Sequence, residues 1–147
     1  MRIALGSDHR GFELKQEIAK KLTELGYNFH DFGCFSPDAV DYPDIAQAVG
    51  KAVASGEFER GVLICYSGIG MSIAANKVKG VRAALCDYPQ TARLARQHND
   101  ANILCLAAIH EPEKVLEILE VFLASEFEGG RHLRRVEKIK AIESCLG

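Results

Sequence analysis

Residues 62–77 read VLICYSGIGMSIAANK and combine a strand, a turn and a helix. The apolar run 62–64 leads into Cys65, and the glycine turn 67–70 follows almost at once. From Met71 onward the segment is compatible with a helix. The turn presents backbone N–H groups and the helix start carries partial positive charge, so an anion is favoured there. The segment therefore predicts an α/β fold with a thiol beside an anion-binding turn.

Strand-like and helix-like patterns alternate along the whole chain. Apolar runs predict strands at Arg2–Ser7, Asn28–Phe32, Gly61–Cys65, Val81–Cys86 and Ile103–Ala107. Helical patterns are found at Phe12–Leu25, Tyr42–Ser55, Ser72–Lys77, Pro89–His98, Pro112–Ala124 and His132–Glu143. Such alternation is typical of a parallel sheet with helices on both faces. We predict a three-layer α/β fold with a five-stranded parallel sheet and an extra C-terminal helix, in one domain over residues 1–147.

The strand order decides where a ligand would bind. In doubly wound sheets, ligands lie beyond the C-terminal ends of the strands, at the point where the strand order reverses. If the order is the flavodoxin-type 2-1-3-4-5, that point lies between the first and third strands. Asp8 and His9 follow the first strand, and Cys65 ends the third. The sequence therefore predicts that these residues meet in one crevice.

Composition excludes several classes of protein. The 147 residues are 48% hydrophobic and 26% charged, with a formal net charge of −2. No apolar run approaches the roughly 20 residues that a membrane span requires. The polar residues 8–10 interrupt the N-terminal run too early for a signal peptide. A general basic face is missing, so nucleic acid is not indicated. We expect a cytoplasmic protein with neither a membrane nor a nucleic-acid partner.

The cysteines indicate free thiols. They are odd in number and widely spaced, without C-x-x-C or paired Cys/His spacing, which favours a reducing compartment and no metal site. Cys65 could be a buried small hydrophobe, but its place before a glycine turn favours a base or nucleophile equally well. The remaining cysteines lack such a setting and are read as small hydrophobes: Cys34, Cys86, Cys105 and Cys145.

Other polar residues allow two interpretations each. Asp8 could cap a helix or face the crevice, and His98 could complement a helix dipole or act in catalysis. Tyr42 could supply a pocket hydroxyl or belong to a turn. Arg131 and Arg135 are four residues apart, so on a helix they share a face that suits either solvent or a phosphate. The glycine turn matches neither the dinucleotide nor the nucleoside-triphosphate fingerprint.

Five segments together carry a family resemblance. They are SDHRGFELK (7–15), DYPD (41–44), CYSGIGMSIAANK (65–77), ARLARQHNDAN (92–102) and FEGGRHLRRVEKI (127–139). Taken jointly, they resemble the ribose-5-phosphate isomerase B family, which also contains bacterial galactose-6-phosphate isomerase subunits. The resemblance implies a Rossmann-like parallel sheet and a homodimer or homotetramer whose active site is shared between subunits. It also implies no cofactor and no metal.

The resemblance implies roles for individual residues. Cys65 is the base that moves a proton between C1 and C2 of an open-chain sugar phosphate, and His98 assists ring opening. The expected contacts to the hydroxyls of the sugar are Asp8, His9, Tyr42 and Asn99. The enediolate is expected to be stabilised by the amides of Ser67, Gly68, Ile69, Gly70 and Met71. The phosphate is expected to be bound by Arg131 and Arg135 of the neighbouring subunit.

Two departures from the family pattern concern the substrate. Tyr66 stands where the family usually has glycine after the cysteine. After the fifth strand, many members carry a turn whose arginine can reach phosphate, whereas this chain reads Ala-Ala-Ile-His at 107–110. We expect the exchange of ribose 5-phosphate with ribulose 5-phosphate, a step of pentose phosphate metabolism. The alternatives are allose, galactose or tetrose phosphates, or a non-catalytic phosphosugar-binding subunit.

Overall fold

A computed structural model of the chain describes residues 1–145. Residues 146–147 of the expected domain, and the side chain of Cys145, lie outside the described residues. The strands are β1 (Arg2–Ser7), β2 (Asn28–Asp31), β3 (Arg60–Cys65), β4 (Ala83–Leu85) and β5 (Ile103–Ala107). The helices are α1 (Phe12–Glu24), α2 (Tyr42–Ala54), α3 (Ile69–Ala75), α4 (Pro89–Asn99), α5 (Pro112–Ala124) and α6 (Arg131–Cys145). None of the described helices is long and apolar enough to cross a membrane.

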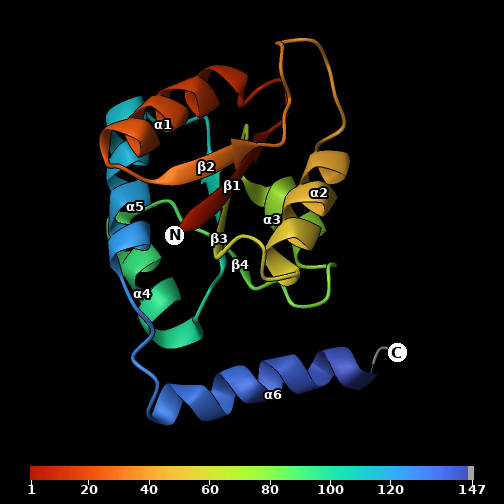
Figure 1. Cartoon of the computed structure of the whole chain (residues 1–147), viewed down its shortest axis with the longest axis vertical. Helices are drawn as coiled ribbons and strands as arrows, with labels where there is room; N and C mark the ends of the chain where they lie inside the picture. Colours follow the sequence, from red (N-terminus) through yellow and green to blue (C-terminus); the bar gives the residue numbers. More distant parts are fainter. Residues whose placement is uncertain (146–147) are drawn as a thin grey trace.

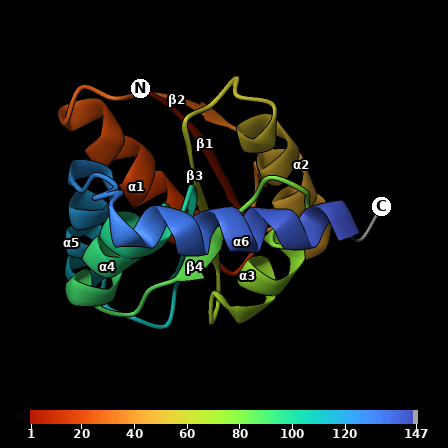
Figure 2. The same ribbon diagram turned by 90° about the horizontal axis from the view of Figure 1, so that it is seen from below.

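The parallel sheet lies between two layers of helices, as predicted (Figure 1). Because side chains alternate along a strand, Val62 and Ile64 of β3 pack with α1, α4 and α5 on one face. Leu63 and Cys65 point to the other face, where α2 and α3 cover the sheet. Both faces are therefore buried, which explains why the strand sequences read as continuous apolar runs. The extra helix α6 runs across the edge where the strands begin (Figure 2).

The order of the strands corrects one detail of the prediction. The sheet runs β2-β1-β3-β5-β4, so β5 and not β4 pairs with β3. All five residues of β5 are buried, whereas the three residues of β4 are only half-buried. The longer and more buried strand, β5, thus takes the inner place, and the short strand β4 forms the edge. The reversal between β1 and β3 is where we predicted it.

The start of α3 also differs from the prediction. The helix begins at Ile69, three residues before the expected Ser72, and ends at Ala75. Gly68 is its N-cap with φ of +77°. A side chain at this position would be strained, and its Cβ would lie 2.5 Å from Leu85. The glycine turn therefore passes directly from β3 into the helix without a linker.

A buried ion pair fixes the end of β2. Lys15 of α1 is fully buried and its ammonium pairs with the carboxylate of Asp31. The other oxygen of Asp31 accepts the N–H of Gly33 at 2.8 Å, and the carbonyl of Gly33 accepts the N–H of Ser7 at 2.7 Å. The pair thus holds the segment that flanks the end of β1.

Lys15→Met is expected to lower the free energy of unfolding by about 3 kcal/mol, because it leaves the partly buried Asp31 carboxylate without its cation. Urea unfolding followed by circular dichroism measures the change. Lys20→Met, at an exposed position of the same helix, is the matched control and should change stability by less than about 0.5 kcal/mol. Equal stability of the two variants would contradict the structural role of the pair.

Candidate active site

A cleft of about 470 Å³ opens at the C-terminal ends of β1 and β3. This is the point where the strand order reverses, and the prediction that Asp8 meets Cys65 there is confirmed. The N–H of Asp8 donates to the carbonyl of Ile64 at 3.2 Å, which ties the two strand ends together. The residues that line the cleft are Asp8, Arg10, Tyr42, Cys65, Tyr66, Ser67, Ile69, Gly70 and Ile73.

Cys65 lies at the floor of this cleft. It is the last residue of β3 and only 5% exposed. Its sulfur accepts the N–H of Gly68 at 3.2 Å. A backbone donor at the sulfur is complementary to a thiolate, the form in which cysteine acts as a base or nucleophile.

The glycine turn supplies further backbone N–H groups. Of the five backbone amides expected to contact an oxyanion, two already donate hydrogen bonds within the chain. Gly68 donates to the Cys65 sulfur, and Ile69 donates to the Ser67 hydroxyl at 3.2 Å. The N–H groups of Ser67, Gly70 and Met71 have no acceptor among residues 1–145. Ser67 and Gly70 line the cleft, so their N–H groups remain available to an anion there, whereas Met71 is fully buried and is not among the lining residues.

Asp8 and Tyr42 also line the cleft. Asp8 does not cap α1, whose N-cap is Gly11. One carboxylate oxygen of Asp8 instead accepts the N–H groups of Arg10 and Gly11, each at 3.0 Å. The Tyr42 ring lies so close to Gly70 that a Cβ there would be 2.6 Å from it. Both side chains are thus held at the cleft and can reach the hydroxyls of a ligand.

His9 follows Asp8 in the sequence but is not among the residues that line the cleft. Its Nδ1 accepts the N–H of Val40 at 3.2 Å. The imidazole therefore secures the loop between β2 and α2, and its other ring nitrogen remains to donate to a ligand.

The remaining expected site residues lie near the N-terminal ends of the strands, on the opposite side of the sheet from the cleft. His98 and Asn99 end α4, which runs back toward the start of β5, and Arg131 begins α6. Because β3 has six residues at about 3.3 Å each, these residues are roughly 16 Å or more from Cys65 within one chain. One chain therefore carries two half-sites, and the structure does not bring them together. α6 does start at Arg131, so Arg131 and Arg135 share a helical face.

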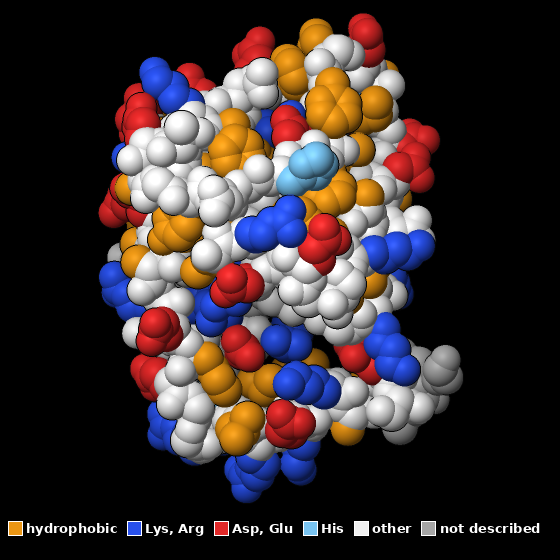
Figure 3. All heavy atoms as spheres, in the orientation of Figure 1, with side chains coloured by type: hydrophobic (Ala, Val, Ile, Leu, Met, Phe, Trp, Pro, Cys, Tyr) orange, Lys and Arg blue, Asp and Glu red, His pale blue; other side chains and the backbone are white. Residues whose placement is uncertain are grey.

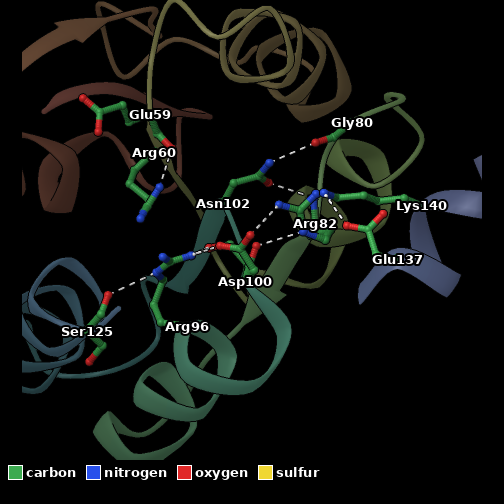
Figure 4. A network of polar contacts seen from close by, with 11 residues as sticks. Glu59, Arg60, Gly80, Arg82, Arg96, Asp100, Asn102, Ser125, Glu137 and Lys140 are labelled. Atoms are coloured by element: carbon green, nitrogen blue, oxygen red, sulfur yellow. Dashed lines mark hydrogen bonds and ion pairs between the residues drawn. The ribbon is translucent and has the colours of Figure 1, made fainter. Parts of the chain in front are cut away.

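An ion-pair network fixes the end of α4 (Figure 4). Asp100 has a left-handed backbone with φ of +48° and caps the helix. Its carboxylate pairs with Arg96 at 2.9 Å and with Arg82 at 3.4 Å. Arg96 is buried and also donates to the carbonyls of Ala101 and Ser125. The network holds the two residues before Asp100, His98 and Asn99, in a defined position.

His98 stacks on His132, with ring centroids 4.2 Å apart and planes 11° from parallel. His132 is buried, and Glu128 lies 3.6 Å from its Nε2. Burial is the main cause that lowers the pKa of His132, and the neighbouring His98 and Arg131 lower it further. The imidazole of His132 is therefore neutral at pH 7.

This trio of side chains also resembles a metal site. The possible ligand atoms of His98, Glu128 and His132 lie within 4.8 Å of one another. Nearly parallel rings, however, direct their in-plane lone pairs side by side and not toward one point. Stacking therefore suits the positioning of His98 better than the tetrahedral binding of a metal ion.

The other described cysteines fit their interpretation as small hydrophobes. Burial raises the pKa of Cys86 to about 11 and also raises the pKa of the fully buried Cys105. Both thiols therefore remain protonated at neutral pH. Cys34 is buried and its sulfur lies 3.9 Å from the Ser7 hydroxyl. Among the described cysteines, Cys65 alone lines the cleft at the strand ends.

The sequence analysis did not identify three residues near the two half-sites. Arg10 lines the cleft, and Glu128 and His132 lie beside His98. His132 lies in the basic stretch RHLRR (131–135), and that stretch is the one sequence signal that points to it. For Arg10, a position directly after Asp8 and His9 is the available signal. The guanidinium of Arg10 contacts the ring of Tyr66. No sequence pattern pairs these two residues, because their contact depends on how β1 and β3 end side by side.

Comparison with known proteins gives a consistent result. The sequence model of the ribose/galactose isomerase family matches residues 3–139. Ribose-5-phosphate isomerase B of Escherichia coli (strain K12) is 48% identical over 143 residues, which cover 97% of this chain and 96% of that protein.

Two solved structures share the whole fold. Ribose-5-phosphate isomerase B of Clostridium thermocellum superposes with a TM-score of 0.98 at 49% identity and covers 100% of both chains. The Mycoplasma genitalium enzyme, solved with bound ribulose 5-phosphate, has a TM-score of 0.94 at 44% identity over 97% of this chain and 96% of that one. On this evidence the chain belongs to the ribose/galactose isomerase family.

Proposed function

We propose that this isomerase interconverts D-ribose 5-phosphate and D-ribulose 5-phosphate. The observation that carries the proposal is the Cys65 sulfur on the floor of a cleft whose turn offers unpaired N–H groups. A similar protein from Escherichia coli is named ribose-5-phosphate isomerase B, and the similar Mycoplasma genitalium structure holds ribulose 5-phosphate. Aldose–ketose exchange requires a base and an oxyanion site, and the cleft provides both.

The proposed mechanism passes through a cis-enediolate. The Cys65 thiolate removes the proton from C2 of the open-chain aldose, and the electron pair moves onto the C1 carbonyl oxygen. The unpaired N–H groups of Ser67 and Gly70, both in the lining of the cleft, stabilise the resulting oxyanion. The proton of the C2 hydroxyl passes to the C1 oxygen, the Cys65 thiol returns a proton to C1, and the C2 oxygen becomes the ketone. Asp8 and Tyr42 hold hydroxyls of the substrate while this occurs.

We propose further that two chains complete one active site, in a homodimer or homotetramer. His98 of one chain would open the sugar ring above Cys65 of the other, with Asn99 and His9 binding hydroxyls. Arg131 and Arg135 would bind the phosphate. The support is that these side chains lie at the two opposite edges of the sheet, so one chain alone cannot use both groups.

The apolar surfaces near both half-sites favour such an assembly. Ile69 and Ile73 at the cleft are 54% and 60% exposed, and Ile142 of α6 is 60% exposed. α6 also borders a hollow of about 430 Å³ with a largely apolar wall, visible between this helix and the body of the molecule (Figure 3). Covering these side chains by a second copy removes apolar surface from water.

We also propose that the chain forms one domain and that it acts in the cytoplasm. The single core on each face of the sheet supports one catalytic domain over residues 1–147. The four cysteines with described side chains are free thiols, which supports the cytoplasm as the compartment.

A panel of aldose phosphates tests the choice of substrate. We expect kcat/KM to be highest for ribose 5-phosphate, compared with allose 6-phosphate, galactose 6-phosphate and a tetrose phosphate. The assay is run with and without a chelator, and we expect equal rates. A higher kcat/KM for another sugar phosphate would make that sugar the preferred substrate of the same mechanism. No turnover of any of them would favour a phosphosugar-binding subunit and contradict the proposed function.

A further inference from the structure

Arg10 is the cationic side chain in the lining of the Cys65 cleft. Its guanidinium carbon lies 3.8 Å from the centroid of the Tyr66 ring, so the planar group lies against the aromatic face. Such contacts are attractive because the ring face carries partial negative charge. The backbone N–H of Arg10 donates to Asp8, which fixes the start of the side chain. Both ends of Arg10 are thus positioned at the cleft.

The charge of Arg10 is not neutralised within the chain. Among residues 1–145, its guanidinium forms no ion pair and no side-chain hydrogen bond. Glu13 and Glu17 line the adjacent hollow with Arg10 but do not pair with it. His110 also lines that hollow, and its Nε2 is paired with Asp87 at 2.8 Å. Arg10 is therefore a preorganised cation with free donors beside the proposed active site.

We infer that Arg10, held in place by Tyr66, binds the phosphate of the substrate from the same subunit as Cys65. The inference rests on the proposed function, because it assumes a phosphorylated sugar in this cleft. Stacking covers one face of the guanidinium and leaves its in-plane N–H donors free for a phosphate. Cys65 is buried at the floor, whereas Arg10 and Tyr66 are exposed at the mouth. The reacting carbons then lie at the floor and the hydrated phosphate at the mouth.

Contact with Arg10 is the role that this proposal assigns to the ring of Tyr66. A glycine after the cysteine would leave Arg10 without a stacking face, and its long side chain would be free to sample many conformations. The phenol ring restricts that freedom before the substrate binds, so less entropy is lost on binding. Tyr66 and Arg10 thus form one unit in which the ring orients the charge.

The test compares Arg10→Met with Arg10→Lys in the full-length protein. Losing one charge-assisted contact is expected to raise KM for ribose 5-phosphate about 10- to 100-fold in Arg10→Met, with kcat within about twofold. Arg10→Lys keeps the charge but lacks the planar fork, so its KM should be intermediate. Tyr66→Leu, which removes the stacking face, should raise KM by a few-fold. Arg2→Met is the matched control, since Arg2 stacks on Phe58 at 4.3 Å outside the cleft, and its KM should be unchanged.

A second readout separates this inference from the proposed function. The dissociation constant of inorganic phosphate, measured by calorimetry, should rise in Arg10→Met by about the same factor as KM. If the wild-type protein failed to isomerise ribose 5-phosphate, the proposed function would be wrong, yet the phosphate affinities would still decide the role of Arg10. An unchanged phosphate affinity in Arg10→Met overturns the inference. A fall in kcat at constant KM overturns it too, because a phosphate contact acts on binding.

Discussion

Replacing Cys65 with alanine is expected to lower kcat for ribose 5-phosphate by about a thousandfold, which is the typical contribution of a positioned general base. The variant keeps the fold because alanine fills most of the space of a small buried thiol at the end of β3. It also keeps the free N–H groups of the turn, so binding of the sugar phosphate should change little. Steady-state kinetics and calorimetric binding of ribose 5-phosphate measure the two effects separately.

Cys86→Ala is the matched control for this experiment. Cys86 is also a buried thiol, but burial holds its pKa at about 11 and it does not line the cleft. We expect this variant to retain kcat within about twofold. If Cys65→Ala were as active as Cys86→Ala, the cysteine base would be excluded and another group in the cleft would have to move the proton.

The second large effect concerns the phosphate. Replacing both Arg131 and Arg135 with alanine is expected to lower kcat/KM by about a thousandfold, mainly through KM, because two charge-assisted contacts of about 2 kcal/mol each are lost. Both side chains are exposed in the isolated chain, so the fold should not change. Lys140→Ala, nine residues from Arg131 and so on the opposite side of α6, is the control and should keep its KM.

Mixed oligomers show whether these arginines serve the cleft of a second chain. Cys65→Ala chains and Arg131→Ala/Arg135→Ala chains are each expected to be nearly inactive at low substrate concentration. In randomly mixed dimers, half of the molecules are heterodimers with one intact site, so about a quarter of the wild-type activity should return. Purified heterodimers without activity would show that Cys65 and the arginines act from the same chain, against the shared site.

Much of the fold could be predicted because its signals are local. The apolar runs that end at Ser7 and Cys65 are continuous, as expected for strands buried on both faces. The exchange of β4 and β5 could not be predicted, because the order of these two parallel strands depends on which one packs better against β3. The early start of α3 depends on Gly68, whose positive φ lets the chain turn at once.

Some features of the candidate site could likewise be predicted from the sequence, and others could not. The meeting of Asp8 with Cys65 follows from where two strands end, and the structure confirms it. The stack of Arg10 on Tyr66 could not be predicted, since the two residues are distant in sequence and their contact depends on side-chain conformation. The placement of His98 at the other edge follows from the direction of α4 once the sheet is known to be parallel.

The exchange of a substrate proton with solvent tests the central claim most directly. With ribose 5-phosphate as the substrate in D₂O, proton transfer through Cys65 and an enediolate predicts one deuterium at C1 of ribulose 5-phosphate, detectable by NMR. The rate of incorporation should fall with kcat in Cys65→Ala. Ribulose 5-phosphate formed without deuterium at C1 by the wild-type protein, and at the same rate by Cys65→Ala, would indicate a hydride shift and contradict the proposed mechanism.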